Sequence, residues 1–385
     1  MKHSNVKKLF AACLTAVLLG TALVSCGNQG SGDGAGTSAG GNNAVGTTGV
    51  VTLTPEEYEK YSFADVQSAF PDIEYVFAFD HGDQTTGDTV SYDEYRYYQL
   101  LYKNYFDNGK EEYWTTNPEM KANVTDMYLR EIRRNHAVQA ECARYGISLS
   151  EGELLALDRK NAEFVAAFGG LDTFREALDM YYMTEYFFAY QGEMETLYSK
   201  LDAYYRENGQ ILTNQADIRA MLDTDAYVCA KHILIKNDAG EDAAKNLALA
   251  QDILSRLNNG EDFDTLMNQY NEDPGMKSEP NGYHFFRGEM VKSFEDAAFA
   301  LEVGQISDIV ESDYGYHIIL RCAKNAEYMD KNLAAISETY TALRFYQLID
   351  EVSANWTQLP SDRYEEIADW SYAVSLGNLY KDKES

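Results

Sequence analysis

The chain has 385 residues, of which 45% are hydrophobic and 24% charged, and its formal net charge at pH 7 is −30. This length predicts more than one domain, and the composition is typical of a globular protein rather than a disordered or fibrous one. The negative charge excludes nucleic acid as a partner, because affinity for phosphate backbones comes from Lys and Arg. It favours solubility, and attraction of basic, unfolded polypeptides is the alternative interpretation.

Residues 1–25 have the features of a secretory signal. Three lysines precede the apolar run 9–24, which is short for a transmembrane helix and ends in small residues. The segment Leu-Val-Ser-Cys at 23–26 resembles the bacterial lipoprotein cleavage motif, which implies a lipid on Cys26; an ordinary signal that happens to contain Cys26 is the alternative. We expect a protein anchored by lipid to the outer face of the bacterial cytoplasmic membrane, with a flexible tether over residues 26–53.

Residues 54–222 are expected to form a helical domain. Ser91 with Glu94, and Ser150 with Glu153, have the spacing of capping boxes at helix starts. Tyrosines recur at three- and four-residue steps after the first of these, and long helical patterns alternate with short loops that contain almost no proline. These features favour an all-α domain.

Residues 223–326 have a different pattern. Strand-like runs at 227–236 and 317–320 enclose helix-like segments at 242–257 and 263–270, and Ser293 with Asp296 resembles a capping box that opens another helix. We expect a compact α+β domain with a small, mainly antiparallel sheet, inserted in a multidomain α and α+β protein. Residues 327–385 are predicted to be helical and to pack on the first helical domain, because a lone amphipathic helix is marginal in water.

Seven short segments of this α+β domain resemble, in order, the landmarks of parvulin-type peptidyl-prolyl cis–trans isomerases. They are AKHILIK (230–236), GEDF (260–263), YNEDP (270–274), RGEMV (287–291), FEDAAFAL (294–301), GQIS (304–307) and YGYHII (314–319). The helical flanks and the lipoprotein signal resemble the PrsA-like foldases, and GISLSE (146–151) is similar, more weakly, to SurA-like chaperones. The resemblance implies an extracytoplasmic foldase that isomerises X-Pro bonds in unfolded secreted polypeptides and chaperones them.

The resemblance also implies polar site residues. His232 and His317 would lie side by side on neighbouring central strands, and Asp273 would face the substrate amide. The alternative interpretations are that the two histidines only brace the core and that Asp273, which precedes Pro274, only forms a turn.

An apolar pocket for proline is implied beside them. Met290 and Phe294, four residues apart on one helical face, would form it, helped by Tyr283 or Phe285 from the preceding loop. The alternative is that these are ordinary core residues. The loop that begins at Asn281 departs from the Gly-Asp-Leu-Gly sequence common in the family, so the resemblance does not identify which residue forms this wall of the pocket.

The implied chemistry needs no cofactor and no metal. The barrier to X-Pro rotation is about 20 kcal/mol and arises from amide resonance, so no bond is broken and no nucleophile is required. The segment after residue 236 lacks a basic cluster, which argues against specificity for phosphorylated substrates. A non-catalytic holdase with a degenerate parvulin domain is the alternative function, and a solute-binding lipoprotein is disfavoured because repeated βα units are missing.

Two cysteines of the α+β domain are expected to be neighbours. If the strands that carry the two histidines run antiparallel, with the histidines roughly opposite each other, Cys229 and Cys322 fall within about two residues of facing each other. The two sulfurs can then either form a disulfide or stay as thiols.

Overall fold

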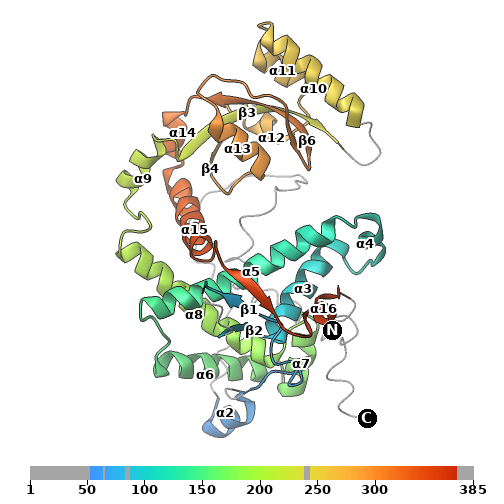
Figure 1. Ribbon diagram of the computed structural model, residues 1–385. Coiled ribbons are helices and arrows are strands. Elements are labelled where there is room, and N and C mark those ends of the chain that lie inside the picture. Colours follow the sequence, from blue (N-terminus) through green and yellow to red (C-terminus); the bar gives the residue numbers. More distant parts are fainter. Residues whose placement is uncertain (1–52, 64–65, 83–86, 238–242, 371–385) are drawn as a thin grey trace. The chain divides into compact units, whose positions relative to one another are not determined.

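A computed structural model describes residues 53–63, 66–82, 87–237 and 243–370 (Figure 1). The expected signal, the expected lipidation site Cys26 and almost all of the expected tether therefore lie outside the described residues. The chain divides into two compact units, whose described parts are residues 53–207 with 346–370, and residues 208–345. The second unit is wider than the range 223–326 expected from the sequence, and its boundary falls inside α15 (Leu333–Val352). Among the described residues, none of the helices combines the length and apolar character that crossing a membrane requires.

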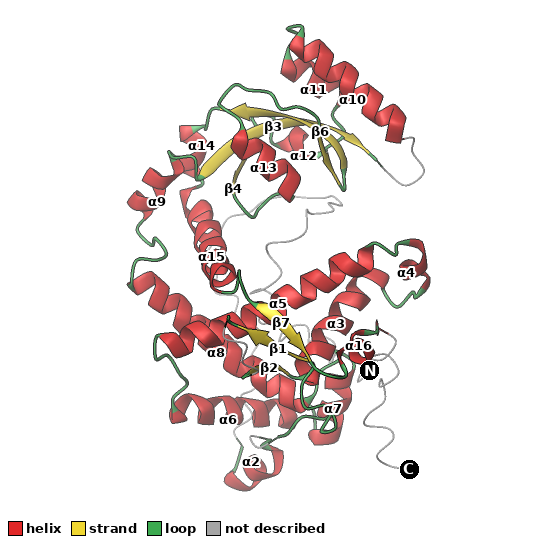
Figure 2. Cartoon of the chain, viewed as in Figure 1, coloured by secondary structure: helices red, strands yellow, loops and turns green. Residues whose placement is uncertain are grey.

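The first unit is mostly helical (Figure 2). Its helices are α2 (Pro55–Tyr61), α3 (Tyr92–Asp107), α4 (Glu112–Thr116), α5 (Met120–Arg144), α6 (Glu151–Ala167), α7 (Leu171–Asp179), α8 (Glu185–Glu207) and α16 (Tyr364–Ala368). The capping box predicted at Ser150 and Glu153 is complete at the start of α6. The one predicted at Ser91 is only half formed: Ser91 accepts the Glu94 backbone N–H, but the Glu94 carboxylate bonds elsewhere.

A three-stranded antiparallel sheet, which the sequence did not predict, lies in this unit. Its order is β2-β1-β7, with β1 (Phe77–Asp80), β2 (Asp88–Val90) and β7 (Thr357–Pro360). The tail predicted to be wholly helical thus supplies a strand, which pairs with β1 from Phe77↔Pro360 to Asp80↔Thr357. An aromatic-rich core packs around it, and Ile367 of α16 is fully buried in that core. Residues from both ends of the described chain therefore build one hydrophobic core.

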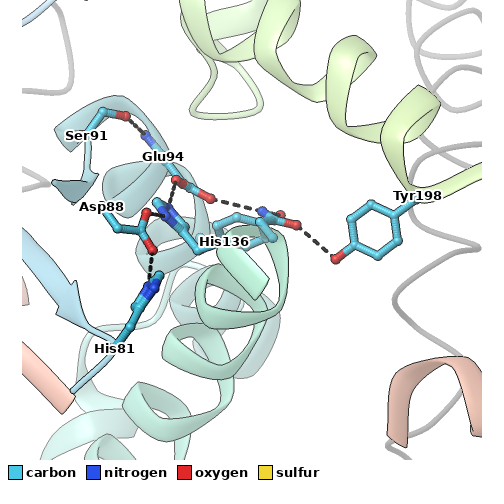
Figure 3. A network of polar contacts seen from close by, with 8 residues as sticks. His81, Asp88, Ser91, Glu94, His136 and Tyr198 are labelled. Carbon is cyan, nitrogen blue, oxygen red and sulfur yellow. Dashed lines mark hydrogen bonds and ion pairs between the residues drawn. The ribbon is translucent and has the colours of Figure 1, made fainter. Parts of the chain in front are cut away.

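A buried histidine beside this sheet contacts two carboxylates (Figure 3). His136 of α5 contacts the carboxylate of Asp88 through Nδ1 and that of Glu94 through Nε2, the latter at 3.1 Å. Burial lowers the pKa of His136, but the two carboxylates outweigh it and raise the pKa to about 10. Protonated His136 therefore donates to both carboxylates and ties β2 to α3 and α5. Further bonds extend the network through His81, Asn135 and Tyr198.

The second unit contains a four-stranded antiparallel sheet with the order β4-β3-β6-β5. The strands are β3 (Tyr227–Lys236), β4 (Tyr283–Phe286), β5 (Val310–Ser312) and β6 (Gly315–Cys322), and the helices other than α15 are α9 (Gln215–Leu222), α10 (Ala243–Asn258), α11 (Phe263–Tyr270), α12 (Gly275–Ser278), α13 (Lys292–Ala300) and α14 (Ala326–Lys331). The small, mainly antiparallel sheet expected from the sequence is confirmed. The capping box expected at Ser293 is wrong, because α13 begins one residue earlier and Val291 precedes it without a side-chain cap.

Alternate residues of the two central strands face different helices. One face, with Ile233, Ile235 and Ile318, packs on α10 and α11 in a single apolar cluster. The other face, with Val228, Ala230 and Ile319, packs on Phe294 and Ala298 of α13. This alternation follows from the two-residue period of a strand, and it places His232 and His317 on the α13 side.

Candidate active site

Two buried histidines meet at the centre of the sheet. In the β3–β6 register, His232 lies opposite Ile319 and His317 lies opposite Leu234, so the histidines are diagonal neighbours on one face. Their Nδ1 atoms are 3.0 Å apart and the imidazole planes are nearly parallel, at 14°. The side-by-side placement expected from the sequence is therefore what the strand register produces.

Asp273 follows α11 and reaches the free side of His232. Asn271 holds this turn on β3, because its side-chain oxygen accepts the Leu234 backbone N–H at 2.8 Å. The Asp273 carboxylate accepts three hydrogen bonds: from His232 Nε2 at 2.7 Å, from the Tyr283 hydroxyl at 2.8 Å and from the Gly275 backbone N–H at 2.9 Å. Burial raises the pKa of Asp273, but these donors outweigh it and lower the pKa to about 2. The carboxylate is thus ionised at neutral pH.

Ser312, which the sequence did not single out, contacts the ring nitrogen of His317 that does not face His232. Its hydroxyl lies 2.7 Å from His317 Nε2 and accepts the Tyr314 backbone N–H at 3.1 Å. Ser312 is the last residue of β5, and the tight turn between β5 and β6 brings it beside His317. No local sequence motif marks this residue. Five side chains form one continuous set of hydrogen bonds, which we call the polar series: Ser312, His317, His232, Asp273 and Tyr283.

Proton positions in the polar series follow from its ends. Burial and the neighbouring His232 lower the pKa of His317 to about 4, so His317 is neutral above that pH. Ionised Asp273 can only accept, and a pair of neutral imidazoles then has one arrangement that satisfies every contact: Ser312 donates to His317, His317 donates to His232, and His232 donates to Asp273. The polar series then has a single direction that ends on the Asp273 carboxylate.

An apolar cluster lies against the two imidazoles. The Phe294 ring is centred 5.1 Å from His232 and 5.5 Å from His317. Phe285 is fully buried, and its ring is centred 5.9 Å from that of Phe294. Met290 is partly buried and packs against the same cluster. Tyr283 belongs to both sets, because its ring packs on this cluster and its hydroxyl bonds to Asp273. The fold thus brings a polar and an apolar surface together at the two histidines.

The sequence of this region identifies its family. Residues 214–324 match the family model described as the PPIC-type PPIASE domain. This region is a parvulin domain. The foldase protein PrsA of Geobacillus sp. (strain WCH70) is 50% identical over 93 residues, which are 23% of this chain and 30% of that protein. The chaperone SurA of Chromohalobacter salexigens is 34% identical over 129 residues, 33% of this chain and 29% of that protein.

The two sequence matches are confined to part of each relative. The chain aligns with about a third of the length of these two proteins. The crystal structure of peptidylprolyl isomerase (PrsA) from Bacillus cereus is 25% identical, with coverage of 66% of this chain and 91% of that one and a TM-score of 0.29. Every described residue of the expected site lies inside residues 214–324, the range that the family model matches.

Tyr283 and Phe285, which the sequence predicted in a loop, lie instead on strand β4 and differ in burial. Phe285 has no exposed surface, so it supports Phe294 from behind. Tyr283 is only half-buried and carries a hydroxyl on the Asp273 carboxylate. Desolvation and the bond to Asp273 raise the pKa of Tyr283, so its hydroxyl remains protonated and is a donor. Of these two residues of β4, Tyr283 is therefore the one with a surface exposed to solvent.

Proposed function

We propose that this protein is an extracytoplasmic foldase whose parvulin domain accelerates cis–trans isomerisation of X-Pro bonds. The observation that carries the proposal is the polar series lying against the ring of Phe294. An isomerase of this kind needs an apolar surface to grip the pyrrolidine ring and polar groups that favour the twisted amide. The parvulin domain places an apolar and a polar surface side by side, because the ring of Phe294 is centred 5.1 Å from that of His232.

The proposed mechanism uses only the residues of the domain. Met290 and Phe294 hold the proline ring, while Tyr283 and Asp273 face the amide. A twisted amide loses resonance, so its nitrogen becomes a better hydrogen-bond acceptor and its carbonyl a weaker one. Donors and an anion fixed in place before binding cost no reorganisation when the amide twists. The two histidines hold Asp273 in position from behind, and a preference of about 3 kcal/mol for the twisted form would accelerate rotation more than a hundredfold.

The remainder of the chain supports a role on unfolded clients outside the cytoplasm. Lipidation at Cys26 and a tether over residues 26–53 would hold the protein at the membrane surface, and the clients would be unfolded secreted polypeptides. The helical domain at 54–222 and the tail at 327–385 would bind these clients together. The pairing of β7 with β1 supports the assignment of the tail to the first domain.

A rate measurement with the full chain tests the isomerase. We expect it to accelerate exchange between the cis and trans forms of a short unphosphorylated X-Pro peptide, as measured by exchange NMR. Asp273→Ala should abolish most of the acceleration, whereas Asp264→Ala should not. Asp264 is half-exposed on α11 and pairs with Lys231, so it is a matched control. A folded chain that binds the peptide and leaves its exchange rate unchanged would favour the non-catalytic holdase instead.

A further inference from the structure

Cys229 and Cys322 lie directly opposite each other on the central strands of the parvulin domain. They form the first pair of the β3–β6 register, which confirms the proximity expected from the sequence, and both are free thiols in the structure. Opposed Cα atoms in an antiparallel pair are about 4.5 or 5.5 Å apart, depending on whether the pair is hydrogen-bonded. Both values fall within the range of about 4.4–6.8 Å that a disulfide spans, so no strand has to move for a bond to form.

The cysteine pair faces away from the polar series. Opposed residues project to the same side of a sheet, and residues three apart along a strand project to opposite sides. Cys229 precedes His232 by three residues, so the thiols share a face with Lys231 and Leu320 instead. Chemistry at the two sulfurs can therefore occur without contact with the site at the histidines.

The two thiols have unequal surroundings. Cys229 is fully buried, and its sulfur lies 3.5 Å from the Asn281 carbonyl oxygen. The backbone of the next residue covers it, because a Cβ added at Gly282 would come within 2.9 Å of the sulfur. Cys322 is partly exposed. An external reagent therefore meets Cys322 first.

The charge balance favours the same order. A hydrogen bond from the Cys229 thiol, helped by the nearby Lys231 ammonium, lowers the pKa of Cys322. The same hydrogen bond, together with burial, raises the pKa of Cys229. The thiolate is the nucleophile in disulfide exchange, so Cys322 is suited to attack and Cys229 to resolve.

We propose that Cys229 and Cys322 are a redox-active dithiol that forms a cross-strand disulfide by exchange with an external disulfide. The Cys322 thiolate attacks one sulfur of that disulfide, whose S–S bond breaks and releases one thiolate. Cys229 then loses its proton and attacks the Cys322 sulfur of the mixed disulfide, which releases the second thiolate. Two cysteine thiols are oxidised, and one disulfide is reduced to two thiols.

Cys142 provides an internal control in the same chain. It is buried in the first unit on α5, and its sulfur lies 3.8 Å from the Leu197 carbonyl oxygen. Burial raises its pKa to about 11, so almost no thiolate is present at neutral pH. Cys142 should therefore remain reduced under conditions that oxidise the proposed pair.

The test is peptide mapping of the folded full chain after incubation with oxidised glutathione, alkylation of free thiols and digestion with trypsin. Cleavage after Arg219, Lys231, Arg321 and Lys324 releases peptides 220–231 and 322–324. We expect these peptides to be linked by a disulfide that dithiothreitol reverses, with alkylated Cys142 in the same sample. The oxidised form should also unfold at a higher urea concentration than the reduced form, because the bond closes a long loop of the unfolded chain.

Two variants separate the steps. Cys229→Ser should stop at a mixed disulfide of Cys322 with glutathione, and Cys322→Ser should leave Cys229 reduced. Three results would overturn the proposal: two alkylated thiols in the oxidised sample, a mixed disulfide as the final product of the unsubstituted chain, or a linked peptide that forms only in concentrated urea. The readout is a mass, so the outcome is independent of whether the domain isomerises X-Pro bonds.

Discussion

Replacing Asp273 with Asn should reverse the direction of the polar series without unfolding the domain. The Gly275 backbone N–H is a fixed donor, so the Asn amide must turn its oxygen towards Gly275 and its NH2 group towards Tyr283 and His232. His232 Nε2 then has to accept, which moves its proton to Nδ1 and makes it the donor to His317. All these contacts can still be satisfied, so the variant should fold.

We work out the catalytic cost from the two side-chain hydrogen bonds, those of His232 and Tyr283, which lose their charged partner. Hydrogen bonds to an ionised group contribute about 1.5–3 kcal/mol and neutral ones about 0.5–1.5 kcal/mol, so each bond weakens by roughly 1 kcal/mol. The substituted side chain is the one proposed to face the twisted amide, so we expect a barrier about 2 kcal/mol higher and a kcat/KM roughly 30-fold lower.

Two measurements check this reasoning. Exchange NMR on an unphosphorylated X-Pro peptide gives the rate, and long-range proton–nitrogen correlations show which nitrogen of His232 carries the proton. Asp264→Asn is the matched control, because it makes the same chemical change on an exposed side chain of α11. A folded Asp273→Asn protein that keeps the unsubstituted rate, or in which the His232 proton stays on Nε2, would refute the reasoning.

Three further predictions concern other parts of the molecule. Met290→Ala should lower kcat/KM roughly tenfold through a higher KM, because about 1.5 kcal/mol of apolar contact with proline is lost, while the urea midpoint hardly moves; an unchanged KM would place proline elsewhere. His317 should keep a neutral NMR signature down to about pH 4. Its folded pKa lies below the unfolded value of about 6.5, so its contribution to stability is complete above that value and declines as the pH falls towards 4; titration near 6.5 in the folded protein would contradict this. His136→Gln should lower the free energy of unfolding of the first unit by about 3–5 kcal/mol in urea titrations, because two buried carboxylates lose their cation. The folded pKa of His136 is raised to about 10, so the unsubstituted protein should have this contribution in full below about pH 6.5 and lose it as the pH rises through 10.

The sequence predicted the parvulin domain far better than the first unit. The order of short motifs predicted the neighbouring histidines, and the antiparallel register then brought Cys229 and Cys322 together. Strands β1, β2 and β7 have only three or four residues each, and β7 finds its partner far along the chain, so no local period marks them.

The capping box predicted at Ser91 is incomplete, and Ser312 was not predicted, because both depend on tertiary contacts. Glu94 has the spacing of a capping residue, but its carboxylate instead forms an ion pair with buried, protonated His136. Ser312 gives no signal in the sequence, because its role depends on the approach of His317 from the next strand. Glu94 and His136 are 42 residues apart, so here a contact distant in sequence outweighs a local preference.

The pairing of β1 with β7 imposes an order on the folding of a chain that emerges from its N-terminus. β1 emerges early, yet one edge of this strand has no hydrogen-bonding partner until residues 357–360 have emerged. All four strands of the parvulin domain lie within 227–322 and emerge before then. The inserted domain is therefore complete while its host is still missing a strand, and a chain that stopped at residue 345 would keep an exposed strand edge open to self-association.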